Sequence, residues 1–383
     1  MGEITGVIEE KVVVEKKAPR QSGIELLRIV AVTLIVAHHL VVHSSFSIMN
    51  EPFSLRRLFY QLCIMPFGKI GITLFLLISL WFLIDGKQSL RLSCRRIWIL
   101  ERELLFWSFV GLTAQYIVDP QSVNEETWLN AIFPISRDVW WYATSYAVLL
   151  LLLPFVLAGL KGMGKTTHTK CCIALLGLWG IVNLIPGSYL DIYINVTGFI
   201  YVTVLLSYYK WYLPSLSNKG AAVLAIIGSS IIIIWNIVLS LLWFGESDKL
   251  LTYINPVQKE WSLPILMVSF GIFILFKGMK FRSRIVNRFA CSAFAVYLIT
   301  EQHYFRDVIW TQLVSLGDFY HSRYTILISL IAVAGIVLVT TVMDFVRQGI
   351  FCLTLDRHKG RFFDRLWDYV EKRAGKLRSV LKE

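Results

Sequence analysis

Long apolar runs recur along the chain, and no other feature of the sequence restricts its fold so strongly. Ten runs can be placed, at residues 24–44, 68–85, 97–118, 139–159, 171–186, 191–209, 220–244, 262–277, 289–307 and 324–346. About 20 apolar residues in a helix span the hydrocarbon core of a bilayer. Only 17% of the residues are charged, whereas about 25% is usual for a soluble domain. The sequence therefore predicts an all-α, polytopic integral membrane protein, with about ten transmembrane helices in one bundle. Because only the turn IPGSYLD separates 171–186 from 191–209, either segment could be re-entrant.

The charges between the apolar runs predict the orientation of the chain. With the N-terminus inside, the inner connections are rich in Lys and Arg, and the outer connections carry more acids. The inner cations are Lys87, Arg91, Arg95, Arg96, Lys161, Lys165, Lys170, Lys210, Lys219, Lys277, Lys280, Arg282, Arg284 and Arg288. Cytoplasmic loops of membrane proteins carry such an excess. We therefore expect both termini in the cytoplasm, with a polar leader over 1–22, one transmembrane domain over 23–346 and a basic tail over 347–383.

The formal net charge of +12 does not indicate a nucleic-acid partner. The basic residues lie in short connections and in the tail, a distribution that fixes topology in a bilayer. The six cysteines show neither metal-ligand spacing nor a disulfide framework. We therefore expect the lipid bilayer as a partner, with no nucleic acid and no metal.

The first apolar run is unusual because it carries Glu25, Arg28, His38, His39 and His43. A charged side chain at the bilayer centre costs about 2.5–3.5 kcal/mol on insertion scales, so such residues usually have a partner or a function. At 100° per residue, Arg28 and His39 share one helix face about 16 Å apart, whereas His38 points about 80° away. His43 lies one turn beyond His39, and Glu25 is placed to pair with Arg28.

Two interpretations of this helix remain open from the residues alone. In one, Glu25 and Arg28 reach the inner interface and the histidines bond to neighbouring helices. In the other, the helix belongs to an enzyme that holds an anionic carrier near one leaflet and places a base in mid-membrane. A neutral imidazole can accept a proton from a hydroxyl at physiological pH.

Several blocks of the sequence resemble one known family. IELLRIVAVTLIVAHH at 24–39, followed by GKIGITLFLLISLWFLI at 68–84, is similar to the membrane acyltransferase-3 family. More narrowly, it resembles the bacterial branch that O-acetylates capsular and other surface polysaccharides. WWYATSYAVLLLLLP, NVTGFIYVTVLLSYYKW and FAVYLITEQHYFRDVIW continue the resemblance through the fourth, sixth and ninth segments. Together these blocks extend it over nearly all of residues 23–346.

The resemblance implies a bacterial plasma-membrane enzyme that transfers an acyl group from acyl-CoA, usually acetyl-CoA. The acceptor would be a hydroxyl of a surface or capsular polysaccharide or of its lipid-linked precursor. The resemblance also implies that His39 is the essential histidine, as general base, and Arg28 its supporting arginine. Two departures matter. SLRLSCRRIWILER lacks the family's two arginines three residues apart, and Ser79 is followed by leucine where the family often has glycine.

Further residues are candidates for the acceptor side of the site. They are polar side chains in the ninth segment and aromatic side chains that suit stacking on a sugar. The candidates are Glu301, His303, Arg306, Trp141, Tyr142 and Tyr146. A polar helix end at the membrane interface and an outer aromatic belt remain open as alternatives.

The phosphates of CoA would arrive among the cations that precede the third segment. Arg91, Arg95 and Arg96 are the candidates, because arginine can bind phosphate with two parallel hydrogen bonds. Topology alone would also place positive charge there. Two rival functions remain: a multi-span transporter or polysaccharide flippase, and a sensor or scaffold that has kept the fold without catalysis.

Overall fold

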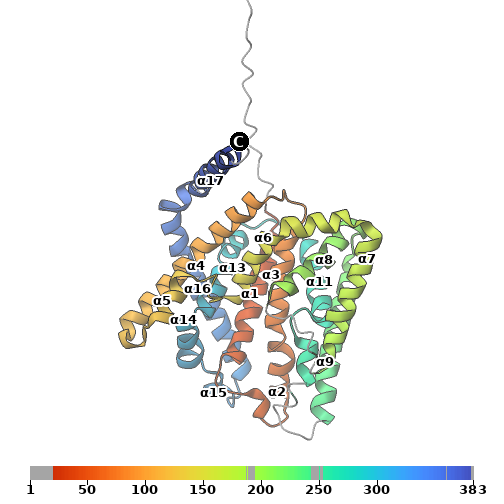
Figure 1. Cartoon of the computed structure of the whole chain (residues 1–383). Coiled ribbons are helices and arrows are strands. Elements are labelled where there is room, and N and C mark those ends of the chain that lie inside the picture. The colour runs from red at the N-terminus through yellow and green to blue at the C-terminus, as the bar shows by residue number, and fades with distance from the viewer. Residues whose placement is uncertain are drawn as a thin grey trace, which may run out of the picture.

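The computed structural model describes residues 20–186, 188, 195–242, 250, 253–358 and 360–380. All regular structure in these ranges is helical (Figure 1). The helices before residue 190 are α1 (Ser22–Val42), η1 (Ile48–Asn50), α2 (Leu55–Phe59), η2 (Tyr60–Ile64), α3 (Phe67–Leu83), α4 (Leu90–Val118), η3 (Pro120–Ser122), α5 (Glu125–Ile132), α6 (Trp141–Gly162), α7 (Gly164–Leu175), η4 (Leu176–Ile181) and η5 (Val182–Leu184). Those after it are α8 (Val196–Tyr212), α9 (Asn218–Leu242), η6 (Asn255–Gln258), α11 (Leu263–Lys277), α12 (Arg284–Ala290), α13 (Ala293–Glu301), α14 (His303–Asp307), η7 (Val308–Leu313), α15 (Leu316–Phe319), α16 (Thr325–Leu353), η8 (Asp356–His358) and α17 (Arg361–Val380).

Six helical stretches within the described residues are long and apolar enough to cross a membrane. They are Ser22–Val42, Leu55–Leu83, Trp141–Gly162, Asn218–Leu242, Asn255–Lys277 and Thr325–Leu353. The chain is therefore an all-helical membrane protein, as the apolar runs predict. The expected count of about ten spans is not reached by this criterion.

The four remaining segments are helical but interrupted, short or charged. Segment 97–118 lies in α4, which carries the charged run Glu101–Arg102–Glu103. Segment 171–186 passes from α7 into a π-helical turn, η4. Helix α8, which overlaps 191–209 and extends beyond it to Tyr212, has 17 residues, and residues 189–194 lie outside the described part.

The expected segment 289–307 is divided among three short helices. Helix α13 ends at Glu301, Gln302 is extended (φ −61°, ψ 129°), and α14 begins at His303. The Gln302 side chain caps α14 by accepting a hydrogen bond from the Phe305 backbone N–H at 3.0 Å. Its amide lies against Gly111 of α4, where an added Cβ would come within 2.2 Å of it. The absence of a side chain at Gly111 thus lets α4 lie close to the break that places Glu301 at a helix end.

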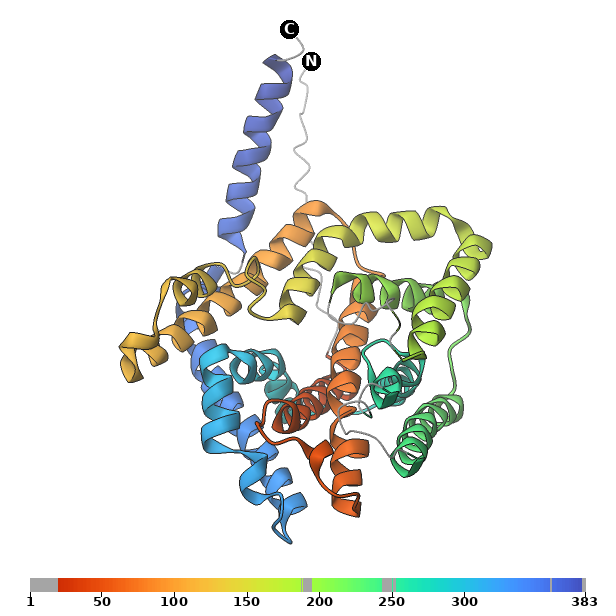
Figure 2. The ribbon, with the colours of Figure 1, turned by 60° about the horizontal axis from the view of Figure 1, so that its bottom comes forward.

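Helix α1 lies inside the bundle and packs most extensively against α3, with α11, α12, α13 and α16 around it (Figure 2). Two glycines of α3 allow the close approach. A Cβ at Gly71 would lie 2.5 Å from the Ala31 carbonyl oxygen, and one at Gly68 would lie 2.4 Å from the His38 ring. Small residues bring helix backbones together in membrane proteins in this way.

Several helix ends gather at one end of the bundle, which we call the basic end. Here α1 begins, α3 ends, α4 begins, and α8 and α11 end. The Lys210 ammonium lies 2.5 Å from the Asp85 carboxylate. Lys210 and Lys277 each lie 4.2 Å from the centre of the Trp81 ring. These contacts join α3, α8 and α11 at the end where we expect the cytoplasm.

The last long apolar helix extends beyond residue 346, where we expect the transmembrane domain to end. Helix α16 continues to Leu353, and α17 then projects from the bundle beyond the basic end (Figures 1 and 2). Residues 1–19 of the expected leader lie outside the described residues.

Candidate active site

Three ionisable side chains from α1 and α13 meet near the end of α1 that lies away from the basic end. The Nε2 atom of His43 lies 2.6 Å from Oε1 of Glu301. The Nδ1 atom of His39 lies 3.2 Å from the same oxygen, at an angle outside hydrogen-bond geometry. The two imidazole centroids are 4.8 Å apart. The structure thus joins His39 to Glu301, which the sequence places 262 positions away.

Burial differs along this cluster. The side chains of His39 and Glu301 are 8% and 13% exposed, whereas that of His43 is 24% exposed. The edge of the Trp310 ring also faces His39, with centroids 6.2 Å apart. The cluster is therefore enclosed on the side of His39 and more open on the side of His43.

The adjacent His38 points elsewhere, as helical phase predicts. Its ring packs against Gly68 of α3 and is buried. The same phase argument places Arg28 on the face of His39, about 16 Å along the axis of α1.

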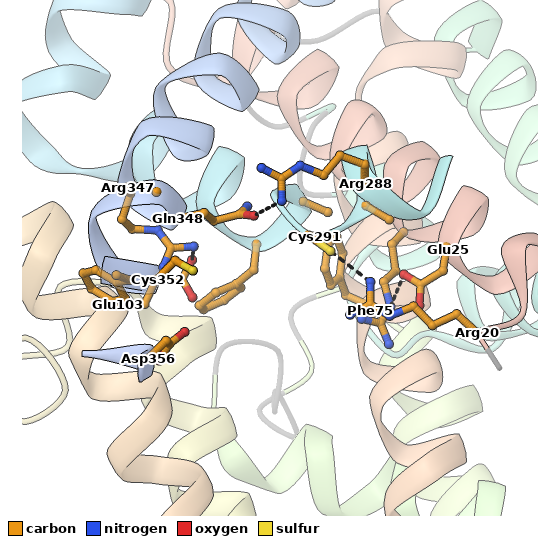
Figure 3. Close-up of a pocket in the computed structure, with 16 residues that line it drawn as sticks. Arg20, Glu25, Phe75, Glu103, Arg288, Cys291, Arg347, Gln348, Cys352 and Asp356 are labelled. Carbon is orange, nitrogen blue, oxygen red and sulfur yellow. Dashed lines mark hydrogen bonds and ion pairs between the residues drawn. The ribbon is translucent and has the colours of Figure 1, made fainter. Parts of the chain in front are cut away.

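Arg28 lines a cavity of about 670 Å³ at the basic end, drawn in Figure 3. The cavity is lined by residues of α1, α3, α4, α12, α13 and the end of α16, together with Arg20, two residues before α1. Its charged lining residues are Arg20, Glu25, Arg28, Glu103, Arg288, Arg347 and Asp356. Four guanidinium groups around one cavity suit a ligand that carries several negative charges.

These cations differ in how firmly other groups hold them. Arg347 is buried between Asp344, at 2.5 Å, and Glu103, at 3.1 Å. Arg28 lies 3.8 Å from the Glu25 carboxylate. Among the described side chains, its Nε atom is buried without a hydrogen-bond partner. Arg28 is therefore the better placed of these two for an incoming anion.

A second, much smaller cavity continues from the first toward His39. Phe75 and Phe294 line both cavities, and the smaller one is closed by Ile35, Ile72, Tyr142 and Tyr297. Its volume is about 10 Å³, room for about one water molecule. Ile35 is one turn before His39 on α1, and Tyr297 is one turn before Glu301 on α13. The two cavities together form a narrow passage along α1 from Arg28 as far as Ile35, one turn short of His39, and none of the three cluster residues lines either cavity.

Of the three aromatic candidates of α6, Tyr142 lines this passage, whereas Trp141 and Tyr146 line neither of the two cavities. Tyr142 is 7% exposed and lies 6.1 Å from Tyr297 and 6.4 Å from Tyr146, ring centre to ring centre. Tyr146 is within electrostatic range of Arg28 and Arg96. Trp141 packs on Phe199. Tyr146 therefore lies on the side of Arg28, and Tyr142 lies between Tyr146 and Tyr297, which is one turn before Glu301.

The other two candidates of the ninth segment follow the helix break. Arg306 is in electrostatic range of Glu301 and His39, and its Nε lies 3.6 Å from the Asp307 carboxylate. His303 is exposed. Of the expected triplet, Glu301 alone contacts His39 directly among the described residues.

The three expected phosphate-binding arginines occupy different surroundings. Arg91 and Arg95 make ion pairs with acids of α17. Arg96 instead points into the bundle, toward Gly86 and Tyr146. Within the described part of the chain, its Nη1 atom is buried without a hydrogen-bond partner.

Sequence reasoning did not single out Arg20, Arg288 or Arg347 as site residues, nor Gln302. Arg288 appeared only as a topological cation, and Arg347 only as the start of the tail. Their gathering depends on how α12 and α16 pack around α1. The role of His43 had a signal in the sequence, because the i, i+4 spacing places it one turn from His39.

His39, His43 and Glu301 also form a group that could hold a metal ion, with ligand atoms within 4.8 Å of one another. Two imidazoles and a carboxylate are a donor set that Zn²⁺ accepts. A separation of 2.6 Å between His43 and Glu301, however, is that of a direct N–H···O hydrogen bond. As the structure stands, this hydrogen bond joins His43 to Glu301.

Comparison with known proteins assigns the chain to a family. A family model described as an acyltransferase domain matches residues 21–345. The chain belongs to the acyltransferase-3 family. It is a membrane acyltransferase, and the match includes His39, Arg28 and Glu301. No curated protein and no solved structure matches the chain significantly.

Proposed function

We propose that this acyltransferase moves an acetyl group, or another short acyl group, from cytoplasmic acyl-CoA to a hydroxyl of a bacterial surface polysaccharide. A lipid-linked precursor of that polysaccharide is an equivalent acceptor. The observation that carries the proposal is the passage that leads from the basic cavity at Arg28 toward the His39–Glu301–His43 cluster. Family membership supplies the reaction class, and the passage supports a donor that enters from one end and reacts near the other.

The basic end suits the anionic part of acyl-CoA. Positive charge in the connections supports a cytoplasmic position for this end. The guanidinium groups of Arg28 and Arg96 are placed to bind phosphate, and Tyr142 and Tyr146 would flank the uncharged arm of the donor. Arg28 and His39 are about 16 Å apart along α1. The phosphates of the donor would therefore lie near one end of this helix, and its reacting thioester carbonyl near the other.

His39 is proposed as the general base. The acceptor O–H gives its proton to the Nε2 atom of His39 while the oxygen attacks the thioester carbonyl. The C–S bond then breaks, and the thiolate takes the proton from His39 to give free CoA. No net proton is consumed. General base catalysis of this kind typically contributes about 10²–10⁴-fold to the rate.

Glu301 is proposed as the residue that orients His39. A carboxylate at Nδ1 favours the tautomer in which Nε2 carries the free lone pair. His43 would hold this carboxylate in place, because it donates to the same oxygen at 2.6 Å. Both roles are positioning roles, since neither residue needs to touch the reacting atoms.

The test is transfer by the purified protein, reconstituted in lipid without any ion gradient. Radiolabelled acetyl-CoA and the host polysaccharide should yield O-acetylated glycan, detected by NMR. Loss of the O-acetyl signal in a deletion strain, and its return on complementation, would identify the acceptor. If the protein instead drives gradient-dependent flux of glycan and transfers no acyl group, the proposal is wrong and the transporter reading replaces it.

A further inference from the structure

The N-terminal part of α4 carries a stripe of four side chains that all contact the C-terminal segment. The stripe consists of Arg91, Arg95, Trp98 and Arg102, at spacings of four, three and four. Residues at these spacings lie on one face of a helix. Each of the four contacts the segment between Asp356 and Asp368, so the contact follows the whole stripe.

The two ends of the stripe are held by ion pairs. Arg91 Nη1 lies 2.8 Å from Asp368 Oδ1, and Arg95 Nε lies 3.4 Å from Asp364 Oδ1. At the other end, Arg102 Nη2 lies 2.9 Å from Asp356 Oδ1.

An aromatic stack lies between these ion pairs. The rings of Trp98 and Phe362 are nearly parallel, with centroids 5.6 Å apart and an interplanar angle of 25°. Phe363 lies on the same indole at 6.5 Å. The tail thus presents a flat ring to Trp98 and carboxylates to the arginines around it.

A phosphorylated adenine nucleotide presents the same groups. Guanidinium groups bind carboxylates and phosphates with the same geometry, and nucleobases stack on aromatic side chains. The stripe lies at the basic end, where the proposed donor enters. The tail and the nucleotide end of acyl-CoA would therefore compete for the same surface.

We propose that α17 is an intramolecular competitor of the acyl-CoA donor. The stripe is the surface to which the 3′-phosphorylated ADP group of the donor binds. In the structure this surface is occupied by Asp364, Asp368 and Phe362 of the tail. The donor must then displace the tail from Arg91, Arg95 and Trp98. This inference rests on the proposed function, because it assumes that the donor is an acyl-CoA.

The contact between α17 and the stripe is exposed enough for a ligand to displace it. The Arg91 and Asp368 side chains are 40% and 61% exposed, and exposed ion pairs contribute little to stability. Along α17, apolar side chains of Phe362, Leu366, Tyr369 and Val370 remain 47–65% exposed. The helix projects from the bundle (Figure 2), and Phe363 is the buried apolar side chain that its release would expose among the described residues of α17.

The tail also lies outside the part of the chain that the family model matches, which ends at residue 345. The competitor is thus an addition to the acyltransferase domain. The tail raises the concentration of donor needed to fill the site, and it does not contact the reacting groups at His39.

The first experiment measures CoA binding to the whole protein in lipid nanodiscs by calorimetry. Asp368→Asn removes the nearer carboxylate of Arg91, at 2.8 Å, and Asp364→Asn removes the carboxylate that lies near both Arg91 and Arg95. Glu371→Gln is the matched control, because it makes the same charge change on an exposed position of the same helix. We expect the double variant to lower the Kd for CoA by about three- to tenfold, the scale of one or two exposed ion pairs. The control should leave the Kd unchanged.

A second measurement follows the tail itself. Saturating CoA should raise amide hydrogen exchange over 361–373 in the unaltered protein, and a chain ending at Gly360 should show the low Kd of the double variant. At saturating acetyl-CoA, transfer by the tail variants should proceed at the unaltered rate, so only the KM for the donor falls.

The outcomes separate the two proposals. Equal CoA affinity in the unaltered protein, in the double variant and in the shortened chain would overturn the competitor role while leaving the proposed function intact. CoA binding absent from all of these proteins would overturn the donor assignment, and the competitor role with it. A lower Kd in Glu371→Gln equal to that in Asp368→Asn would show a general charge effect, which also contradicts the competitor role.

Discussion

The Nε2 atom of His43 and the Oε1 atom of Glu301 lie 2.6 Å apart, and this contact ties the end of α1 to the end of α13. His39 lies 3.2 Å from the same oxygen. One carboxylate oxygen therefore lies beside two imidazole rings, hydrogen-bonded to His43 and close to His39. His39 is the more deeply buried of the two and is the proposed base. The predictions below follow from this arrangement and from the passage that leads to it.

His39→Gln should lower the rate of acyl transfer by at least about 10²-fold, because the reaction loses its general base. Membrane insertion should be unchanged. His38→Gln is the control: this ring packs on Gly68 and faces away from the cluster. Initial rates with radiolabelled acetyl-CoA make the comparison. Equal losses in the two variants would argue that the effect is one of folding.

Glu301→Gln and His43→Gln should both reduce kcat and leave the KM for acetyl-CoA unchanged, because they act on the orientation of His39. We expect the larger loss for Glu301→Gln, since it contacts His39 directly. His43→Gln keeps an N–H donor at about the reach of Nε2, so it should lose less rate than His43→Ala. A rise in donor KM with unchanged kcat would contradict a positioning role.

Arg28→Ala should raise the KM for acetyl-CoA by about tenfold or more, the scale of a charge-assisted hydrogen bond. The matched control is Arg137→Ala, which removes a half-exposed arginine paired with Glu126 at 3.6 Å, outside the basic-end cavity. An unchanged donor KM in Arg28→Ala would rule out its role in binding the donor.

Phe75→Ala should relax the preference for short acyl groups. Phe75 lines both the basic-end cavity and the constriction of about 10 Å³. One methylene typically changes discrimination by about 10–200-fold, so the ratio of butyryl to acetyl transfer should rise about tenfold or more. Phe82→Ala, on the same helix but 52% exposed, should keep the original ratio. An unaltered ratio in Phe75→Ala would place the acyl group elsewhere.

Gly111→Ala should reduce kcat by about three- to tenfold. The new Cβ would come within 2.2 Å of the Gln302 amide, and moving that amide breaks the cap on α14, which costs about 0.5–2 kcal/mol. Glu301 immediately precedes Gln302. Gly335→Ala, where no atom lies within 4 Å of the added Cβ, is the control for both activity and thermal stability. Activity equal to the control would show that the helix break tolerates the shift.

Much of this arrangement could be predicted from the sequence. The apolar runs predicted an all-helical membrane protein, and helical phase separated His38 from the face of Arg28 and His39. These inferences needed only local periodicity. The family assignment, which extends over 21–345, also had visible blocks in the sequence.

The partners of these residues could not be predicted, because they depend on packing between distant segments. Nothing local indicates that Glu301 ends a helix, since the break at Gln302 depends on Gly111 of α4. Nor does any local pattern bring Arg347 to the cavity that holds Arg28. The aromatic residues of α6 are candidates for sugar stacking or for an outer aromatic belt from the sequence alone, whereas the contact of Tyr142 with Tyr297 of α13 places that ring inside the bundle.

The continuation of α16 past the matched domain has a practical consequence for dividing the chain. Arg347, Gln348, Phe351 and Cys352 line the basic-end cavity, yet all four follow residue 345, where the recognised domain ends. A fragment that ends at that boundary would keep His39 but lose the residues of α16 that line the basic-end cavity. The smallest unit that keeps the whole cavity is therefore longer than the matched domain.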